Sequence, residues 1–213
     1  LSALYFLRQV YPGCALECYT LHEQIIAGDA GSPYRYRILS PMLAETLMPL
    51  IPGAPIVANA AAYTLLHAIM FPLMFAALYH WLRVWLTADR ALIGVLVFAV
   101  LLPLGMYVYF LSAYSVLEVI LFSVGLLMLI RPRVNPVAFG VLVVLATLNR
   151  ETAFVLPVAL FAVTRNWRMA LGMGALWLIT YAALWLTVGS AEHIVTLPYL
   201  WQQNTGEYLA YAL

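Results

Sequence analysis

Long apolar segments separated by short polar ones make up most of this chain. Four of them are long enough to cross the ~30 Å hydrocarbon core of a bilayer as helices: residues 59–85, 91–111, 115–130 and 169–188. Two shorter apolar segments, 136–148 and 152–163, reach only about 18–20 Å at 1.5 Å per residue. They are expected either as two short spans in a thinned or water-filled region, or as one re-entrant pair.

The composition agrees with this pattern. Hydrophobic residues make up 65% of the chain and charged residues 9%, and the mean hydropathy is +0.95, values typical of a polytopic membrane protein. No polar stretch is long enough to form a soluble domain, and the net charge of +1 argues against a nucleic-acid partner. We therefore expect an all-α fold: one polytopic transmembrane helix bundle over residues 1–213, with a long outer loop that carries amphipathic interfacial helices.

Arginines beside the apolar segments give the expected orientation. The polar connections on one side of the alternating segments hold six of them: Arg83, Arg90, Arg131, Arg133, Arg165 and Arg168. Because basic residues collect on the cytoplasmic side, this side is expected to be cytoplasmic. Residues 13–58, 112–114, 149–152 and 189–206 then face outward, which favours two separate crossings for the short apolar pair.

The two ends of the chain are expected to continue this plan. Residues 1–12 are typical of the outer end of an earlier span, and the chain opens on Leu1 without an initiator methionine. Residues 189–213 are predicted to form an outer loop and the start of a further helix. We therefore expect the chain to be part of a longer membrane protein.

The outer loop between residues 13 and 58 carries two helical patterns. Residues 15–27 are helical in character. Ser32 followed by Pro33 is typical of an N-cap and the first residue of a second helix. On that helix one stripe is apolar and is formed by Ile38, Leu39, Met42, Leu43, Thr46 and Leu47, and the other holds Arg37, Ser40, Ala44 and Glu45. This pattern predicts an amphipathic helix in the membrane interface, with Arg37 on its polar face.

Three polar segments place charge where a bilayer disfavours it: residues 28–37, 114–118 and 149–152. The predicted topology brings all three to the outer face, so we expect an active site there. Each of the ten basic residues is an arginine. Arginine suits bidentate binding of phosphate, although a GC-rich coding sequence explains the same bias.

Asp29 and the arginines that follow it are the first candidates for chemistry. Asp29 is a candidate general base exposed above the membrane, or else an Asx cap of its Gly-rich turn. Glu23 is the second-choice carboxylate. Arg35 is expected to point with the apolar stripe, where it either snorkels to headgroups or awaits the anion of a lipid-linked phosphate.

The other candidates lie at the outer ends of the spans. Glu118 is expected about one turn inside a span, beneath Tyr114, facing a cavity or a partner. Arg150 and Glu151 lie at the tip between the two short segments. They either pair with each other, or lie in water, or line a water-filled depression together with Asn149.

Metal and haem sites are not indicated. Cys14 and Cys18 lack further ligands at zinc spacing, and His67 and His80 are expected to be packing or interfacial residues. The loop after residue 189 combines Glu192 and His193 with aromatic and amide side chains. This composition suits sugar binding, and equally an ordinary aromatic belt.

These features resemble the GT-C superfamily of lipid-phosphosugar glycosyltransferases. The resemblance covers about residues 23–213 and lies in the multispanning plan, the long first outer loop with its acidic residue, and the outer-face arginines. Two segments look like motifs of uncharacterised bacterial membrane proteins of this type: Pro33-Tyr34-Arg35-Tyr36-Arg37-Ile38-Leu39-Ser40-Pro41 and Asn149-Arg150-Glu151-Thr152. Many members carry a paired acidic motif in that loop, whereas here Asp29 stands between Gly28 and Ala30.

The resemblance implies an inverting transfer of a sugar from a polyprenyl phosphate to an acceptor, on the extracytoplasmic side of a bacterial inner membrane. Asp29 is then the catalytic base, and Arg35, Arg37 and Arg150 neutralise the departing phosphate. The remaining expected substrate-binding residues are Tyr114, Glu118, Asn149 and Glu151. No metal site or cofactor is predicted besides the lipid-linked donor, and the expected partners are membrane lipid and other membrane proteins.

Two other functions fit the same sequence. One is a non-catalytic integral subunit of a respiratory or photosynthetic membrane complex. The other is a transporter, for which the short spans and Glu118 are the pointers, although no internal repeat supports it.

Overall fold

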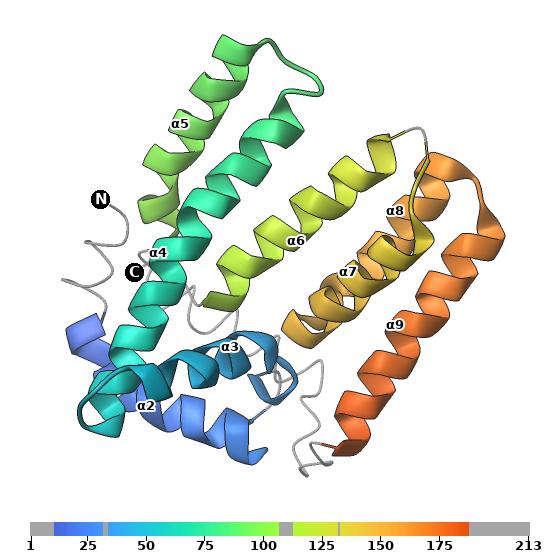
Figure 1. Ribbon diagram of the computed structural model, residues 1–213. Coiled ribbons are helices and arrows are strands. Elements are labelled where there is room, and N and C mark those ends of the chain that lie inside the picture. The colour runs from blue at the N-terminus through green and yellow to red at the C-terminus, as the bar shows by residue number, and fades with distance from the viewer. Residues whose placement is uncertain (1–10, 32–33, 107–112, 132, 188–213) are drawn as a thin grey trace, which may run out of the picture.

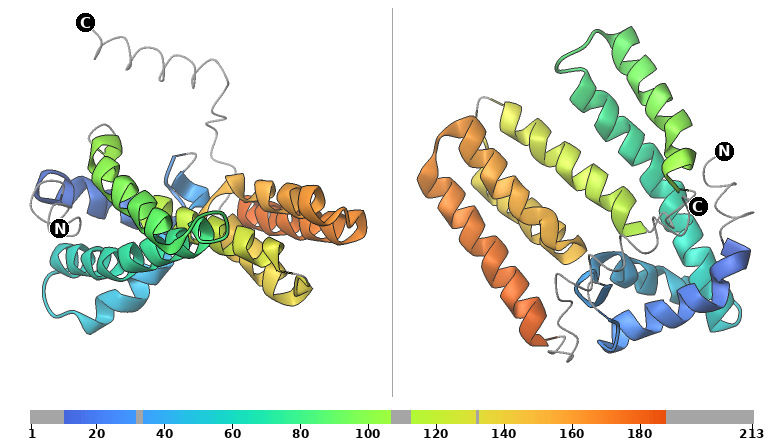
Figure 2. Two further views of the ribbon diagram at one scale, coloured as in Figure 1. Left: turned by 90° about the horizontal axis from the view of Figure 1, so that it is seen from above. Right: turned by 180° about the vertical axis from the view of Figure 1, so that it is seen from behind.

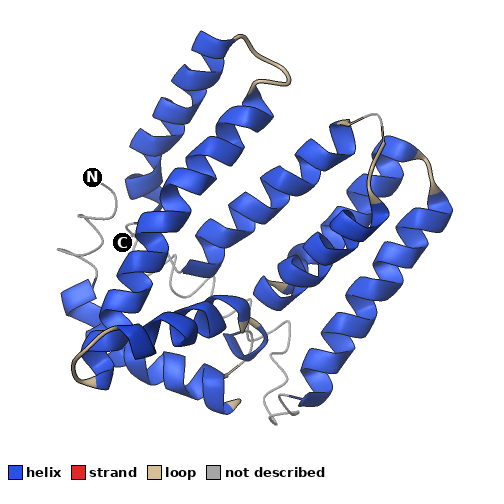
Figure 3. Cartoon of the chain, viewed as in Figure 1, coloured by secondary structure: helices blue, strands red, loops and turns tan. Residues whose placement is uncertain are grey.

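A computed structural model describes residues 11–31, 34–106, 113–131 and 133–187, and in these ranges every regular element is helical (Figure 3). In chain order the elements are α2 (Tyr11–Ala27), η2 (Tyr34–Tyr36), α3 (Leu39–Leu47), η3 (Met48–Leu50), α4 (Pro55–Leu82), α5 (Ala88–Met106), α6 (Ala113–Ile130), α7 (Pro136–Asn149), η4 (Glu151–Phe154), α8 (Val155–Thr164) and α9 (Trp167–Thr187). The all-α prediction is confirmed. The expected earlier span, the Ser32–Pro33 helix start, and the final loop with Glu192 and His193 lie outside the described residues.

Two of the described helices are long and apolar enough to cross a membrane: Pro55–Leu82 and Trp167–Thr187. Three further apolar helices are shorter: Ser115–Ile130, Pro136–Asn149 and Glu151–Thr164. Only 6% of the most apolar 18-residue stretch of α9 is buried inside the protein. This helix therefore exposes most of its apolar surface.

The helices α4 to α9 form a broad, shallow row, with α4 and α5 on one side and α9 on the other (Figures 1 and 2). The connections α4–α5, α6–α7 and α8–α9 lie at one end of this row (Figure 1). These connections or their flanks hold the six arginines expected to share one side. At the other end, α3 packs against α4, α6 and α7, and α2 packs against α3 and α4.

The start and end of α7 position the residues of interest. Asn135 caps the helix, its side-chain oxygen accepting from the backbone N–H groups of Val137 and Ala138 at 2.9 and 3.2 Å. Pro136 follows at the first position, where a missing N–H costs nothing. The helix ends at Asn149 because Arg150 is extended (φ −164°, ψ 143°). Asn149–Thr152 is therefore a break between two helices, as predicted.

From residue 34 on, the predicted second outer-loop helix is not continuous. The chain forms only a 3-10 turn at Tyr34–Tyr36, and α3 begins at Leu39. Pro41 explains the difference. It has no N–H and its ring disfavours the position four residues after Arg37 in a continuous helix, so it fits best in the first turn of a helix, where α3 places it.

The predicted orientation of α3 is also wrong. Arg37, Ser40 and Ala44 were expected on an outward polar face, but all three are buried, whereas Met42 from the apolar stripe is exposed. Small side chains at Ser40 and Ala44 allow α3 to approach its neighbouring helices closely, and the charge of Arg37 is matched inside the protein. The buried face of α3 therefore includes Ser40 and Ala44 from the predicted polar stripe, whereas Glu45 from the same stripe is exposed. Of the connection predicted at residues 112–114, Ala113 and Tyr114 already belong to α6, which corrects that boundary.

Candidate functional site

Four charged side chains, from the segment before α3, from α6, and from the break after α7, lie where α3 contacts α6 and α7. Arg37 donates through Nη2 to Oε1 of Glu151 at 3.3 Å. Arg150 donates through Nη1 to the Glu118 carboxylate. Thr152 donates to Oε1 of Glu118 at 2.6 Å. We call these residues, with Ser40 and Asn149, the ion-pair cluster.

At the break after α7, three consecutive side chains point to three different partners. Asn149 reaches α3, where its Oδ1 accepts from the Ser40 hydroxyl at 3.5 Å. Arg150 reaches α6 and Glu151 reaches Arg37. Within the described residues no ion pair joins Arg150 to Glu151, so the alternative in which these two neighbours pair with each other is wrong.

The ion-pair cluster is largely withdrawn from solvent. The exposed fraction of the side chain is 8% for Arg37, 36% for Glu151, 29% for Arg150 and 21% for Glu118. Charges at this depth need an opposite charge nearby. The second carboxylate oxygen of Glu151, Oε2, is buried and has no hydrogen-bond partner among the described residues.

An aromatic wall lies beside Glu151, and the sequence analysis missed it. Trp177 and Tyr181 stack in parallel on α9, with ring centroids 5.7 Å apart and an interplanar angle of 5°. Tyr36 lies 5.8 Å from Tyr181, and Phe154 lies 6.0 Å from Trp177. The signal was the spacing of four residues between Trp177 and Tyr181, which puts both rings on one helix face.

One hydrogen bond shows at which level along the axis of α9 the ion-pair cluster lies. The indole Nε1 of Trp177 donates to the backbone oxygen of Glu151 at 3.3 Å. Trp177 is the middle residue of α9, which has 21 residues. The tip between α7 and α8 is therefore level with the middle of α9 rather than with its end, because α7 and α8 are short.

An apolar groove of about 300 Å³ runs past Glu118 on its other side. It lies between α4 and α6. Its lining consists of Leu78, Trp81, Glu118, Val119, Phe122, Ser123 and Leu126. Glu118 thus borders both the ion-pair cluster and an open apolar groove.

Asp29 lies apart from these contacts, in the turn that ends α2. Gly28 has φ 81°. Its N–H bonds to the oxygen of Ile25 at 3.2 Å, and the N–H of Asp29 bonds to that of Gln24 at 2.8 Å. This is a Schellman cap, which uses only the backbone of Asp29. The Asp29 side chain is exposed and makes no ion pair or hydrogen bond with the described residues, so the cap does not account for the carboxylate.

The side chains of Arg35 and Tyr114 lie outside the described part of the chain, and their predicted roles stay predictions. Glu23, the second-choice carboxylate, is exposed and accepts a hydrogen bond from the Tyr19 hydroxyl. This hydrogen bond and the adjacent negative charge raise the pKa of Tyr19 above its ordinary value.

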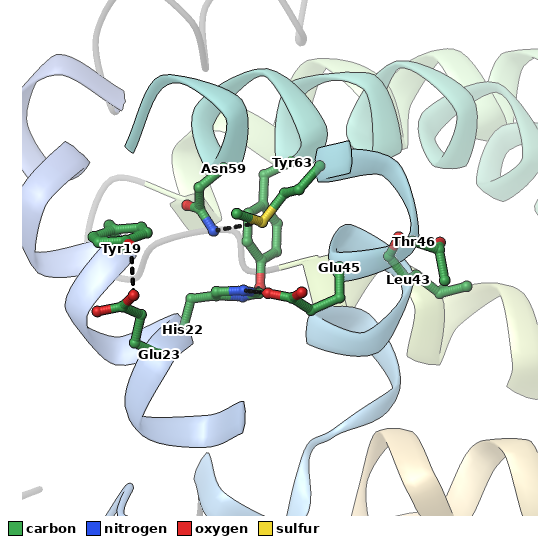
Figure 4. A network of polar contacts seen from close by, with 9 residues as sticks. Tyr19, His22, Glu23, Leu43, Glu45, Thr46, Asn59 and Tyr63 are labelled. Carbon is green, nitrogen blue, oxygen red and sulfur yellow. Dashed lines mark hydrogen bonds and ion pairs between the residues drawn. The ribbon is translucent and has the colours of Figure 1, made fainter. Parts of the chain in front are cut away.

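A second polar group, which we call the His22 junction, joins α2, α3 and α4 (Figure 4). The Nε2 atom of His22 lies 2.8 Å from Oε1 of Glu45, and its Nδ1 atom lies 3.0 Å from the Tyr63 hydroxyl. Since an ionised carboxylate only accepts, Nε2 carries a proton and donates to Glu45. His22 is only 2% exposed. No local pattern in the sequence pointed to this residue.

The other two described histidines make structural contacts. His67 is buried and donates through Nδ1 to the Tyr63 carbonyl at 2.6 Å, and His80 packs against Tyr79. Among the described residues no three His, Cys, Asp or Glu side chains are placed to hold a metal ion. Cys18 is disulfide-bonded.

Comparisons with known protein families, with characterised proteins and with solved structures give no match. The case for a function therefore depends on the geometry of the site.

Proposed function

We propose that this chain is a multi-pass protein of a bacterial inner membrane that transfers a sugar from a polyprenyl phosphate to an acceptor on the outer face, as GT-C glycosyltransferases do. The observation that carries the proposal is that two arginines and an aromatic wall occur in the same site, at the level of the middle of α9. Arginine binds phosphate through two parallel hydrogen bonds. Aromatic side chains offer a large apolar surface beside the polar groups that orient a ligand.

In this proposal the donor phosphate competes with Glu151 and Glu118 for Arg37 and Arg150. The sugar then lies against Tyr36, Trp177 and Tyr181, where Oε2 of Glu151 accepts from one of its hydroxyl groups. The groove between α4 and α6 takes part of the apolar chain. Arg35, Tyr114 and Asn149 complete the set of substrate-binding residues implied by the resemblance.

The reaction is a displacement at the anomeric carbon. An acceptor hydroxyl oxygen forms the new bond to this carbon, and the bond to the phosphate oxygen breaks. Its electron pair leaves with the lipid phosphate, whose charge Arg37 and Arg150 stabilise. The hydroxyl proton goes to Asp29 as the general base.

Donor binding tests the proposal directly. Arg37→Gln is expected to weaken binding of a polyprenyl-phosphate sugar by about 10–100-fold, the usual loss for a hydrogen bond to a charged group. Binding is measured by titration of the detergent-solubilised protein. Arg83→Gln, at the opposite end of the row, is the matched control and should bind as the wild type does. Equal binding by both variants contradicts the assignment of Arg37.

The proposed topology predicts opposite labelling of two exposed loops. Thr87 lies in the connection between α4 and α5, and Ala54 precedes α4 on the far end. A membrane-impermeant thiol reagent added to intact cells should label Ala54→Cys and leave Thr87→Cys unlabelled. The arginines around Thr87 support this orientation, as does the disulfide of Cys18, a bond typical of oxidising compartments. Equal labelling contradicts it.

One observation favours a second candidate, a non-catalytic subunit of a membrane complex. Each arginine of the ion-pair cluster already faces a carboxylate, as in a structural network, and α9 leaves a broad apolar surface for another protein. Absence of transfer from every polyprenyl-phosphate donor, together with copurification of pigment or haem proteins, would favour this function. Transport stays the third prediction.

A further inference from the structure

The helix that leads to Asp29 has few buried attachments. Two of the described side chains of α2 are buried, His22 and Ile25, whereas Leu16 and Ile26 are exposed. Of the two, His22 alone makes hydrogen bonds, and they join α2 to α3 through Glu45 and to α4 through Tyr63. For the described side chains of α2, the His22 junction therefore supplies the polar attachment to α3 and α4.

The turn carrying Asp29 is fixed to this helix. Two backbone N–H groups, those of Asp29 and Ala30, bond to the oxygen of Gln24 at 2.8 and 3.0 Å. Ala30 is fully buried, so the residue that follows Asp29 is packed against the protein. Gln24 is two residues from His22. Movement of the helix at His22 is therefore passed to the Asp29 carboxylate.

The same helix reaches toward the ion-pair cluster. Besides α3 and α4, α2 contacts η2, the turn that directly precedes Arg37. One short helix, α3, also links the two polar groups. Ser40 near its start faces Asn149 in the cluster, and Glu45 near its end faces His22.

We propose that His22 is a positioning residue: through Glu45 and Tyr63 it holds the end of α2 so that the Asp29 carboxylate faces the reacting acceptor hydroxyl. This inference rests on the proposed function, because it assigns a role to the base of that reaction. His22 itself does not touch the substrate. The other titratable groups near it are Tyr19 and Glu23 on its own helix and His67 on α4.

The test combines kinetics with hydrogen exchange on the full chain in detergent. His22→Ala is expected to lower kcat for transfer from a polyprenyl-phosphate sugar by about 100-fold, the loss typical of a small misplacement of a catalytic group, with KM for the donor nearly unchanged. Amide exchange in residues 18–30 should become about tenfold faster. His80→Ala, on the other half of α4, is the matched control and should change neither quantity.

Two milder variants keep the test decisive if His22→Ala does not fold. His22→Gln still offers a donor to Glu45 and an acceptor to Tyr63, so it should recover most of kcat. Tyr63→Phe removes the hydrogen bond to His22 and leaves the one between His22 and Glu45, so it should fall between the wild type and His22→Ala.

The double variant separates positioning from chemistry. If His22 acts through Asp29, then Asp29→Asn combined with His22→Ala should be no slower than Asp29→Asn alone. A further loss in the double variant, or faster exchange in residues 18–30 with unchanged kcat, overturns the inference. Failure of the proposed function looks different, because the wild type itself would then transfer no sugar.

Discussion

Asp29→Asn is expected to lower glycosyl transfer by about 10²–10⁴-fold, the usual span for loss of a general base. The amide cannot take a proton at neutral pH, although it has nearly the same size and still accepts hydrogen bonds. Since the Schellman cap uses only the backbone of Asp29, the fold should not change. Transfer is measured with a polyprenyl-phosphate donor, and thermal unfolding in detergent should agree with the wild type.

Glu23→Gln is the comparison for this variant. Glu23 lies six residues earlier on the same exposed helix, and its carboxylate already accepts from Tyr19. It should retain transfer. Full activity of Asp29→Asn combined with loss in Glu23→Gln would move the role of base to Glu23.

Arg150→Met is expected to cost about 3 kcal/mol of stability, because it leaves the Glu118 carboxylate without its cation in a partly buried place. The value is at the low end for a buried pair, since both side chains keep some exposure and Thr152 still donates to Glu118. The midpoint of thermal unfolding in detergent should fall by several degrees. Arg131→Met, at the exposed end of α6, should unfold as the wild type does.

A double-mutant cycle isolates the pair. Glu118→Gln with Arg150→Met removes both charges, and most of the lost stability should return. If the double variant is as unstable as the sum of the two single ones, the contact between Glu118 and Arg150 does not stabilise the protein. The ion-pair cluster would then have to be explained by binding alone.

Local signals in the sequence predicted most of the helices. The apolar segments gave their approximate positions, and the segment 136–148 agrees with α7 to within one residue. Charge also predicted which segments meet: the three polar segments were expected on one face, and the structure brings Arg37, Glu118 and Arg150 together there. Ionic groups in an apolar chain have few stable places, so their positions are informative.

The orientation of side chains was harder to predict. The polar face of α3 was expected to meet water, but it meets charges that lie more than 100 residues away in the sequence. Pro41 was a local signal that was overlooked. His22 has its partners 23 and 41 residues away, and no periodicity reveals such contacts. Trp177 and Tyr181 were hidden because aromatic residues are common in any apolar segment.

Under the proposed topology, the height of the tip between α7 and α8 predicts that donor binding depends on membrane voltage. With α9 across the bilayer, an anionic headgroup that enters from outside and reaches Arg150 crosses about half of the transmembrane field. At 100 mV, negative inside, this opposes binding by about 1 kcal/mol for each negative charge. Donor affinity should therefore be several-fold weaker in energised vesicles than in detergent, and collapse of the potential with an ionophore should remove the difference.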